Sequence, residues 1–427
     1  MSSSSQKARD SFERLKSYKS VEDLVERIRT KTVTDTKSDR LPVELAVTTE
    51  GTTKRREFIE EQTKKKTPGL FGTKPFEDQS LLQGNIENYI GMTSIPTGVI
   101  GPVRIIGSAA HGDFFVPLAT SEGALVASYH RGAKACYLAG GATSVCLVEG
   151  VQRSPLFKFE NLTYLGEFLG WALQQTSKFI EITAATSGHA VLNDMKLNIE
   201  GNHLIMTFEF YTGDASGQNM VTICTNAICQ YIIENAPVKP THWFIEGNYS
   251  GDKKATALSF TSVRGKKVTS EIVLPEKIVN DVLKTTPQSM DDYWRSSTVG
   301  IIQSGAIGAQ GHYANGLAAL LLATGQDVAC VAEAAMGITR MEVNDDGSLY
   351  ASVTLPNLIV GTVGGGTALP TQRECLEMMD CFGPGNARKF AEICGAVVLA
   401  GELSIAAALA AGHFSSAHQK LGRKSKA

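Results

Sequence analysis

The spacing of apolar and polar residues divides the chain into three kinds of sequence. Residues 1–88 are rich in Lys, Arg, Glu, Ser and Thr and have few large apolar runs. Within them, Ser20 opens a capped amphipathic pattern that predicts a helix to Ile28, and residues 54–62 predict a second helix. We therefore expect a small helical N-terminal domain over residues 1–88.

A glycine-rich, apolar texture occupies residues 89–153 and returns after Gly247. Glycines and prolines between residues 96 and 102 separate short strands, and a helix is expected from Ser121 to about Tyr137. A long helix-like apolar run lies near the C-terminus. Residues 89–153 and 246–427 are therefore expected to form one large mixed domain with a long central helix, used for substrate binding and catalysis.

Residues 154–245 interrupt this large domain with a different pattern. Helical spacing around residues 165–175 and over 219–234 alternates with strand-like segments at 195–199, 204–211 and 243–246. Strands alternating with helices favour a small, compact, ferredoxin-like insert. The fold class predicted for the whole chain is α+β.

Composition narrows the class of protein. The 427 residues carry a formal net charge of −2, which does not favour nucleic acid or an anionic membrane as a partner. Eight cysteines are scattered without a Cys-x-x-Cys pair, so reduced core residues are expected, with neither disulfides nor a bound metal. The N-terminus lacks an apolar signal stretch, and the apolar runs at 317–323 and 396–411 are interrupted or too short to span a bilayer. We expect a soluble, cytoplasmic protein.

Four ionisable residues stand in unusual surroundings. Glu122 is a lone carboxylate among small and apolar residues, where lost hydration would raise its pKa toward neutrality; helix capping is the alternative. Lys253 lies in a glycine-bearing loop, Asp327 follows an apolar run, and His418 follows the last helix-like run. Singly, these three are typical of a solvated lysine, a capping aspartate and a surface histidine. Together, the four would make a proton-handling set around a carbonyl group.

Two glycine-rich motifs are candidates for holding a nucleotide. Residues 213–220 precede an expected helix, whose N-terminal amides suit phosphates. Residues 361–367 would let the backbone approach a ligand closely. Neither motif has the spacing of a Rossmann fingerprint or of a P-loop, so a plain turn stays open for each.

These segments, in this order, resemble the 3-hydroxy-3-methylglutaryl-coenzyme A (HMG-CoA) reductases from about residue 85 to residue 418. Further matching motifs are Glu87–Gly91, Gly140–Ala142, His312–Asn315, Tyr350–Leu355 and Leu399–Ser404. The Gly-Asp loop at 213–214 and the run at 247–254 are closer to the class I pattern than to class II. The resemblance is to the catalytic portion, without the membrane anchor of animal and fungal forms.

Enzymes of this family reduce a thioester to an alcohol with two hydrides from a nicotinamide cofactor. By resemblance, Lys253 stabilises the oxygen of the thioester and of the mevaldyl intermediate, and Glu122 donates a proton to the aldehyde oxygen. Asp327 matches the residue that holds the lysine and the glutamate in their charge states. His418 matches the acid that protonates the departing coenzyme A thiolate. The implied activity is reduction of HMG-CoA to mevalonate in isoprenoid biosynthesis.

The resemblance also implies binding residues and partners. The substrate-binding positions are Arg153, Asn248, Asp252, Lys254 and Asn315. The cofactor-binding positions are Ser177, Lys178, Asp214, Ala215, Ser216, Gly217, Gln218, Asn219, Gly364, Gly365 and Gly366. The Glu87–Gly91 motif matches a dimer interface, so a homodimer or a dimer of dimers, with the active site between subunits, is expected to bind HMG-CoA and NADPH.

Four positions that differ from the family pattern bear on specificity and regulation. Tyr211 stands where many class I members carry an arginine, a typical partner of the 2′-phosphate of NADPH. Lys178 aligns with a second such position and still offers a charge, so NADPH is favoured over NADH. Tyr313 replaces a small residue, which would reshape the substrate side. Ser425 lies in a basic context that resembles a phosphorylation site, although its spacing differs from the family pattern.

Three alternatives to the biosynthetic reaction stay open. The first is NADH-linked oxidation of mevalonate in catabolism, which cofactor preference would discriminate. The second is a different acyl-CoA substrate. The third is a non-catalytic homologue, against which the presence of all four chemical residues counts.

Overall fold

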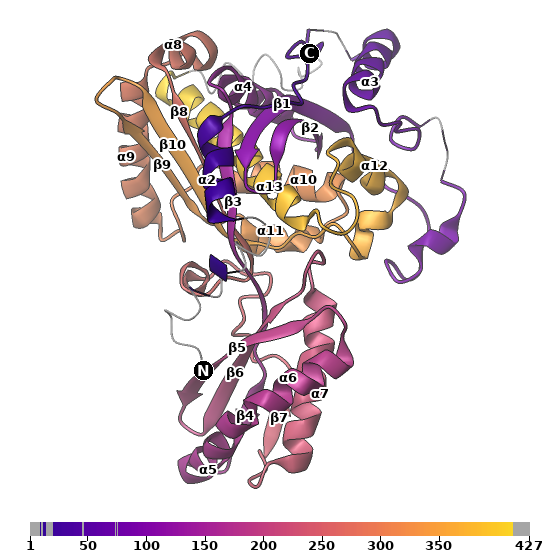
Figure 1. The fold of residues 1–427 in the computed structure, drawn as a ribbon, viewed down its shortest axis with the longest axis vertical. Coiled ribbons are helices and arrows are strands. Elements are labelled where there is room, and N and C mark those ends of the chain that lie inside the picture. The colour runs from indigo at the N-terminus through magenta and orange to yellow at the C-terminus, as the bar shows by residue number, and fades with distance from the viewer. Residues whose placement is uncertain are drawn as a thin grey trace, which may run out of the picture.

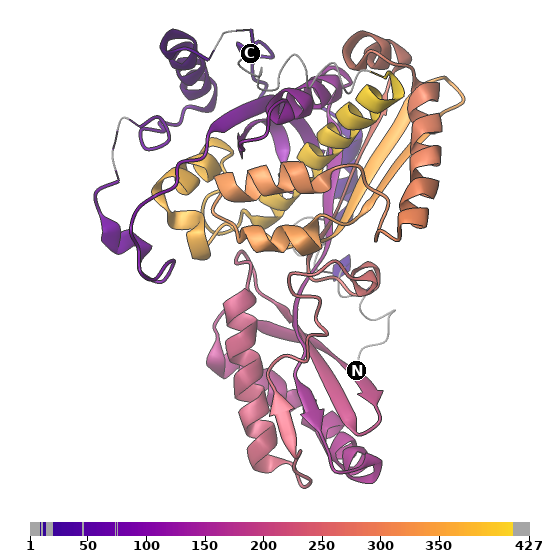
Figure 2. The same cartoon turned by 180° about the vertical axis from the view of Figure 1, so that it is seen from behind.

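The chain folds into two bodies that share one long strand (Figures 1 and 2). The computed structural model describes residues 9, 12–13, 20–44, 47–72, 74 and 76–412, so His418 and Ser425 lie outside the described residues. Strand β3 (Ala142–Arg153) pairs with the sheet of the larger body through residues 142–150 and with the smaller body through residues 151–153. We call these bodies the large unit and the small unit.

The large unit is built on a mixed sheet covered by helices. Its strand order is β2 (His111–Ala119), β1 (Thr97–Gly107), β3, β8 (Gly265–Leu274), β10 (Leu349–Leu358) and β9 (Ile338–Val343). Only the β1–β3 pair is parallel. The covering helices are α4 (Leu125–Leu138), α8 (Glu276–Ile278), α9 (Pro287–Ser304), α10 (Tyr313–Ala323), α11 (Val331–Ala334), α12 (Pro370–Met378) and α13 (Ala387–Ala410).

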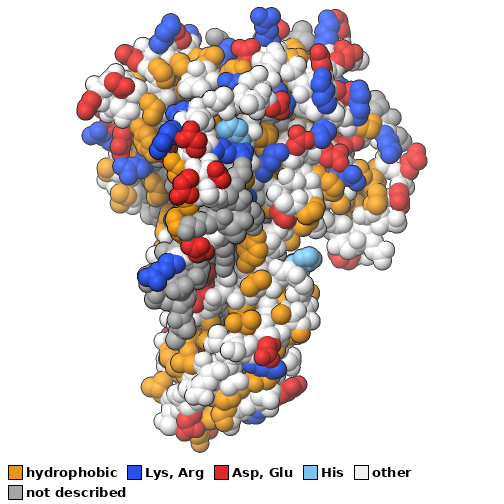
Figure 3. Space-filling model, in the orientation of Figure 1, with side chains coloured by type: hydrophobic (Ala, Val, Ile, Leu, Met, Phe, Trp, Pro, Cys, Tyr) orange, Lys and Arg blue, Asp and Glu red, His pale blue; other side chains and the backbone are white. Residues whose placement is uncertain are grey.

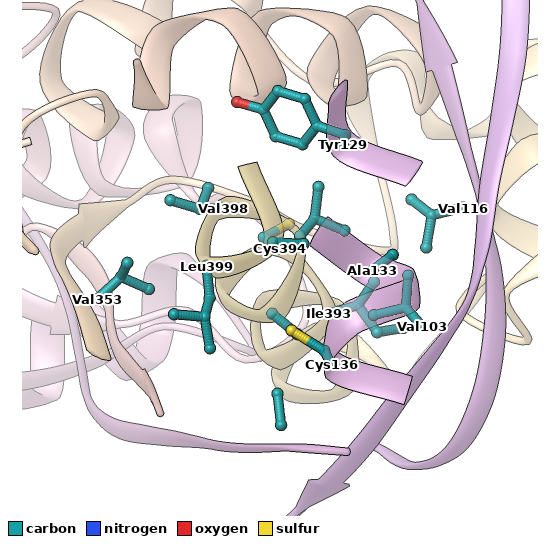
Figure 4. Close-up of a cluster of buried hydrophobic side chains, with 14 of the residues drawn as sticks. Val103, Val116, Tyr129, Ala133, Cys136, Val353, Ile393, Cys394, Val398 and Leu399 are labelled. Atoms are coloured by element: carbon teal, nitrogen blue, oxygen red, sulfur yellow. The ribbon is translucent and has the colours of Figure 1, made fainter. Parts of the chain in front are cut away.

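Helix α13 passes through the middle of the large unit, as the central helix predicted from the sequence (Figure 1). Its side chains Ile393, Cys394 and Val398 gather with residues of α4, of the β1–β2 hairpin and of β10 (Figure 4). In the described chain α13 has the length and composition of a membrane span, contrary to the expectation that this run is too short. However, 83% of its most apolar window is buried inside the fold. Its apolar composition therefore follows from its place in the core.

The small unit has the strand order of a split β-α-β fold. Its elements are β4 (Leu156–Lys158), α5 (Leu162–Ala172), α6 (Thr176–Thr186), β5 (Val191–Glu200), β6 (His203–Tyr211), α7 (Gln218–Asn235) and β7 (His242–Phe244). The sheet order is β7-β4-β6-β5 with every neighbouring pair antiparallel, which is the ferredoxin-like arrangement expected for residues 154–245. Two helices and a 3-10 turn replace the single helix expected around residues 165–175. The α+β class is confirmed.

The N-terminal segment lies on the large unit. Helix α2 (Val21–Thr30) has the predicted cap, because the Ser20 side chain accepts a hydrogen bond from the Asp23 amide; α3 (Thr49–Thr63) and a 3-10 turn (Gln79–Leu82) follow. Leu41 and Ile59 are buried against Phe115 and Met378 of the large unit. Much of the described segment's buried apolar surface is thus shared with its neighbour, and its standing as a separate domain stays a prediction.

Helices α4 and α13 cross at unusually close range. A Cβ atom built at Gly132 of α4 would lie 1.8 Å from the Ala400 carbonyl oxygen, and one at Gly401 of α13 would lie 2.3 Å from the Tyr129 ring. Glycine is required at both positions because only a residue without a Cβ lets the backbones approach this closely.

We therefore expect Gly132→Ala to lower the stability of the large unit by about 3 kcal/mol, since a well-packed crossing has no room for an added methyl group. Gly166→Ala is the matched control: this glycine is exposed on helix α5, and no other atom lies within 4 Å of an added Cβ. That control should leave stability unchanged or raise it by roughly 0.5–1 kcal/mol. Thermal denaturation followed by circular dichroism measures both, and equal midpoints for the two variants would contradict the close-packed crossing.

Candidate active site

Lys253 and Asp327 form an ion pair at the centre of the candidate site. The Lys253 Nζ atom lies 2.8 Å from Asp327 Oδ2, and the two side chains are 46% and 45% exposed. The other carboxylate oxygen, Oδ1, accepts from the Ala329 amide. Asp327 therefore also caps the short 3-10 turn that follows it, as the capping interpretation of its sequence predicts. The hydrogen bond that Lys253 donates to Asp327 raises the pKa of Lys253, although partial burial opposes it. The lysine is therefore held as an ammonium ion that faces solvent.

Glu122 and Asn315 form a second pair. The Asn315 amide nitrogen donates to both carboxylate oxygens of Glu122, at 3.1 and 2.8 Å. The expectation that Glu122 is buried is wrong for the single chain, because its side chain is exposed. Helix α4 begins only at Leu125, after a left-handed residue at Ala124, so the apolar residues of this run turn inward while Glu122 stays in the preceding loop.

The two pairs lie at opposite ends of α10. Asn315 is in the first turn of this helix, and Asp327 follows four residues after its last residue, Ala323. Eleven helical residues with a rise of 1.5 Å each separate the two ends by roughly 16 Å. One chain therefore does not bring Glu122 and Lys253 together through this helix. His418, the fourth residue of the predicted set, lies outside the described residues.

Four of the five predicted substrate-binding residues lie near Lys253 in the chain or in contact with its loop, and the fifth, Asn315, pairs with Glu122 instead. Arg153, at the end of β3, donates to Asp252 at 3.1 Å and to Glu246 at 3.3 Å. Burial alone would raise the pKa of Asp252, but the charges of the arginines beside it lower it overall. Lys254 is exposed and donates to the Asp252 carbonyl, and Asn248 is exposed in the same loop with a left-handed φ of 60°. This loop thus presents alternating charges beside the Lys253 ammonium.

The two predicted cofactor motifs touch each other. Ala215 pairs with Val363 in a parallel bridge, and a Cβ atom at Gly361 would lie 2.5 Å from the Ser216 nitrogen. Gly217 has a φ of +80° and starts α7 without a side-chain cap, so the N-terminus of this long helix, at Gln218 and Asn219, suits an anion. The exposed Gly364 and Gly365, with half-buried Gly366, continue the second motif.

This double loop continues toward the ion pair. A Cβ atom at Gly325 would lie 2.2 Å from the Gly366 carbonyl oxygen. The Gln326 side chain donates to the Gly361 carbonyl and accepts from the Gly361 amide. Residue 327 follows directly, so the glycine motifs and the Lys253–Asp327 pair belong to one continuous surface.

Asp214 has a different environment from the one expected of a cofactor contact. Its carboxylate accepts from the Gly385 amide at 2.7 Å and from the Ala387 amide at 3.0 Å. It therefore caps the N-terminus of α13 and ties the small unit to the large one. Ser177 and Lys178 lie on α6, which packs against α7, and the Lys178 ammonium pairs with Glu181 at 2.8 Å.

Tyr313 does not reshape the substrate side as expected. Its side chain is 1% exposed and its hydroxyl accepts from Thr339 at 3.1 Å. The first turn of α10 directs Asn315 outward and Tyr313 into the core, so the larger residue fills space inside the fold.

A groove of about 1160 Å³ between α3 and α4 escaped prediction from the sequence. Arg55 and Arg56 of α3 line one side, His130, Arg131 and Lys134 of α4 line the other, and Glu122 also reaches it. Apolar residues complete the lining: Leu41, Val43, Val47, Ile59, Leu70, Phe71, Ile95, Val99, Val126, Val282 and Met378. Burial, helped by the Lys134 charge, lowers the pKa of His130. Four cations on an apolar groove fit a long ligand with anionic groups.

The face of the molecule drawn in Figure 3 carries side chains of both signs of charge.

Arg264 and Glu333 are two further residues that sequence reasoning missed. They are 1% and 0% exposed and form an ion pair with each other. Arg264 also donates to Asp252, and Glu333 accepts from the Lys253 amide. No local pattern marks either residue, because the partners lie far apart in the sequence.

Comparison with known proteins identifies the family of the chain. The pattern of the hydroxymethylglutaryl-coenzyme A reductase family matches residues 51–423, so the chain belongs to that family. The reductase of Methanocaldococcus jannaschii is 43% identical over 376 residues, covering 86% of this chain and 92% of the relative. That of Pyrococcus horikoshii is 45% identical, with 83% and 87% covered, and reductase 1 of Hevea brasiliensis is 38% identical, with 87% and 66% covered.

The fold also matches a solved structure. The class II HMG-CoA reductase of Streptococcus pneumoniae, bound to NADPH in open conformations, superposes with a TM-score of 0.68. The match covers 84% of this chain and 96% of the other, at 17% sequence identity. At that identity the likeness shows the shared fold.

The ion pair makes a prediction about pH. Replacing Asp327 by Asn removes the hydrogen-bonding charge that raises the pKa of Lys253, so the pKa should fall toward or below its ordinary value. Lys253 should then react with an amine-selective reagent at lower pH than in the wild type, which peptide mass spectrometry measures. Lys277 pairs with Asp281 far from this loop and is the internal reference. An unchanged profile at Lys253 would show that the pair does not control its protonation.

Proposed function

We propose that this chain reduces HMG-CoA to mevalonate and free coenzyme A, using two NADPH and two protons. The observation that carries this proposal is the Lys253–Asp327 ion pair at the edge of two touching glycine loops, in a chain of this family. The first hydride converts the thioester to a hemithioacetal, which releases the thiol. The second hydride converts the resulting aldehyde to the alcohol.

Lys253 suits the role of electrostatic stabiliser in both hydride steps. Because Asp327 raises the pKa of Lys253, the side chain stays protonated at neutral pH. A fixed ammonium group stabilises the oxyanion that develops on the carbonyl oxygen. Glu122 is proposed as the proton donor to the aldehyde oxygen, with Asn315 orienting it through two hydrogen bonds. His418 is proposed as the acid that protonates the thiolate.

A second copy of the chain is proposed to complete the site. Glu122 and Lys253 lie at opposite ends of α10 within one chain, whereas the chemistry requires both beside the same carbonyl group. Ile86, Ile90 and Met92, around the Glu87–Gly91 motif, are 49%, 102% and 54% exposed, which suits an interface. A homodimer with shared active sites accounts for both the separation of Glu122 from Lys253 and the exposed apolar residues. Two such dimers could associate further into a dimer of dimers.

The groove between α3 and α4 is proposed to hold the coenzyme A part of the substrate. Coenzyme A combines a long, mostly neutral pantetheine arm with three phosphate groups. The groove supplies an apolar floor, the cations Arg55, Arg56, Arg131 and Lys134, and direct continuity with Glu122. Because Glu122 lines the same groove, this assignment is consistent with a thioester end that lies beside the proposed proton donor.

Lys134→Ala should raise the KM for HMG-CoA about tenfold and leave kcat nearly unchanged, since a charge-assisted phosphate contact is uniform binding. Lys239→Ala, in the small unit after α7, is the control with the same change of charge. Steady-state kinetics at two salt concentrations measures the effect, which should shrink at high salt. Equal KM values for the two variants would remove the groove from the substrate site.

NADPH is proposed as the cofactor, with its phosphates at the N-terminus of α7 and at Gly364–Gly366. Lys178 is the proposed partner of the 2′-phosphate, since α6 lies against α7 (Figure 1). The NADPH found in the streptococcal enzyme supports the same assignment. A class I arrangement is supported by the higher identity to the archaeal and plant enzymes than to the class II structures. NADH-linked oxidation of mevalonate remains the second candidate.

The direct test is cofactor oxidation by the pure protein with HMG-CoA. Two NADPH consumed for each coenzyme A released, with NADPH preferred over NADH, is the expected result. Lys178→Ala should reduce that preference about tenfold, because one charge-assisted contact contributes on the order of 1.5 kcal/mol. Preference for NADH would support mevalonate oxidation instead, and no turnover with either cofactor would refute the reductase assignment.

A further inference from the structure

One buried arginine, Arg264, joins four separate segments of the chain. Arg264 lies immediately before β8 and donates to Glu333 of α11, to Gln218 at the start of α7 and to Asp252, the last at 2.9 Å. Its own amide donates to the Asn357 side chain at 2.9 Å. The small unit, the Lys253 loop, α11 and β10 therefore meet at one residue.

Glu333 connects the same guanidinium to the backbone of Lys253. One of its carboxylate oxygens accepts from Arg264, and the other accepts from the Lys253 amide at 3.2 Å. Lys253 has a φ of +56°, a left-handed conformation that costs free energy for any residue with a side chain. The hydrogen bond that this amide donates to a fully buried carboxylate helps to hold that conformation. It also sets the point from which the lysine side chain departs toward Asp327.

The burial of both groups makes this arrangement stiff. Burial raises the pKa of the Glu333 carboxyl and the neighbouring Arg264 charge opposes that rise, so the two groups depend on each other. Removing one partner of such a pair leaves the other buried without compensation. The planar fork of arginine also fixes the directions of its bonds, which a lysine ammonium does not.

We propose that Arg264 and Glu333 are positioning residues that hold the Lys253 loop in register with the cofactor loop. Neither residue faces the site; both act through others, Arg264 through Asp252 and Gln218 and Glu333 through the Lys253 amide. This inference rests on the proposed function and adds a structural reason why the ammonium and the hydride donor meet at the same carbonyl group, the ammonium at its oxygen and the hydride at its carbon.

Three variants separate charge from geometry. Arg264→Lys keeps the charge but loses the fork, Arg264→Met loses both, and Glu333→Gln keeps the shape of the acceptor. We expect kcat with HMG-CoA to fall about 100-fold in both Arg264 variants, since a displacement of about 1 Å can have such an effect. Glu333→Gln should cause about a tenfold loss, and the KM for HMG-CoA should change less than threefold in every variant.

The pH profile distinguishes positioning from general destabilisation. Removing the Arg264 charge allows the pKa of Asp252 to rise, so the acidic limb of kcat/KM should move to higher pH in Arg264→Met. In Arg264→Lys, which keeps the charge, the acidic limb should lie at its wild-type pH, while kcat stays low. Glu392→Gln is the matched control, since Glu392 is as deeply buried on α13 but bonds to Ser108, Ala110 and Cys146 instead.

Several outcomes would overturn the proposal. They are an unchanged kcat in the Arg264 variants, an equal loss of kcat in Glu392→Gln, or a loss confined to KM. Active-site titration with NADPH fluorescence corrects kcat for any unfolded fraction, and Glu333→Gln offers a milder change if Arg264→Met does not fold. If the wild-type protein does not turn over HMG-CoA, the proposed function fails instead, so the two failures are distinguishable.

Discussion

The hydrogen-bonded burial of helix α13, through Glu402, Ser404 and its capped first turn, is the constraint on which the other functional parts depend. The helix is apolar along most of its length, but three polar side chains project from it into the core. Glu392 accepts from the β1–β2 turn and from Cys146, Glu402 accepts from Gly311 and His312, and Ser404 accepts from Arg131 of the groove. Asp214 caps its first turn from the small unit. Because buried polar groups need partners, each contact fixes a neighbouring element at a defined height along the helix.

These contacts differ in their electrostatics as well as in their place. Burial raises the pKa of Glu392, which has backbone amides and a hydroxyl but no cation among its partners. Burial would likewise raise the pKa of Glu402, but the bonds from His312 and from two backbone amides lower it overall. Glu402 is thereby kept as an anion at the N-terminus of α10, the helix that carries Asn315. The orientation of the Glu122–Asn315 pair therefore depends on a charge buried deep in the core.

Sequence reasoning succeeded where the signal is local. The helix cap at Ser20, the alternating strands of the small unit and the approximate extents of α4 and α7 follow from spacing and capping residues. The resemblance placed Lys253 and Asp327 in one site. The structure pairs them directly although they lie far apart along the chain. Glu122 was misjudged because a run of small residues does not reveal where the chain leaves the core.

Long-range partners could not be predicted in the same way. Arg264 and Glu333 are separated by 69 positions and meet because α11 packs against β10, the strand that pairs with β8. The groove is equally non-local, since α3 and α4 supply its two sides from segments about 75 residues apart along the chain. Neither feature leaves a periodic or motif-like trace in the sequence.

Asp214 shows how a motif residue can have a structural role besides the one that its motif suggests. Its family motif suggested a cofactor contact, yet both carboxylate oxygens are engaged by amides at the start of α13. The Asp214 carbonyl also accepts from the Thr362 amide, which fixes the first glycine motif against the second. An aspartate here is needed because the exposed N–H groups of a helix start favour a negative charge. The cofactor loop is thus anchored to the same central helix that positions Asn315 and the groove, and one buried element sets the geometry of all three.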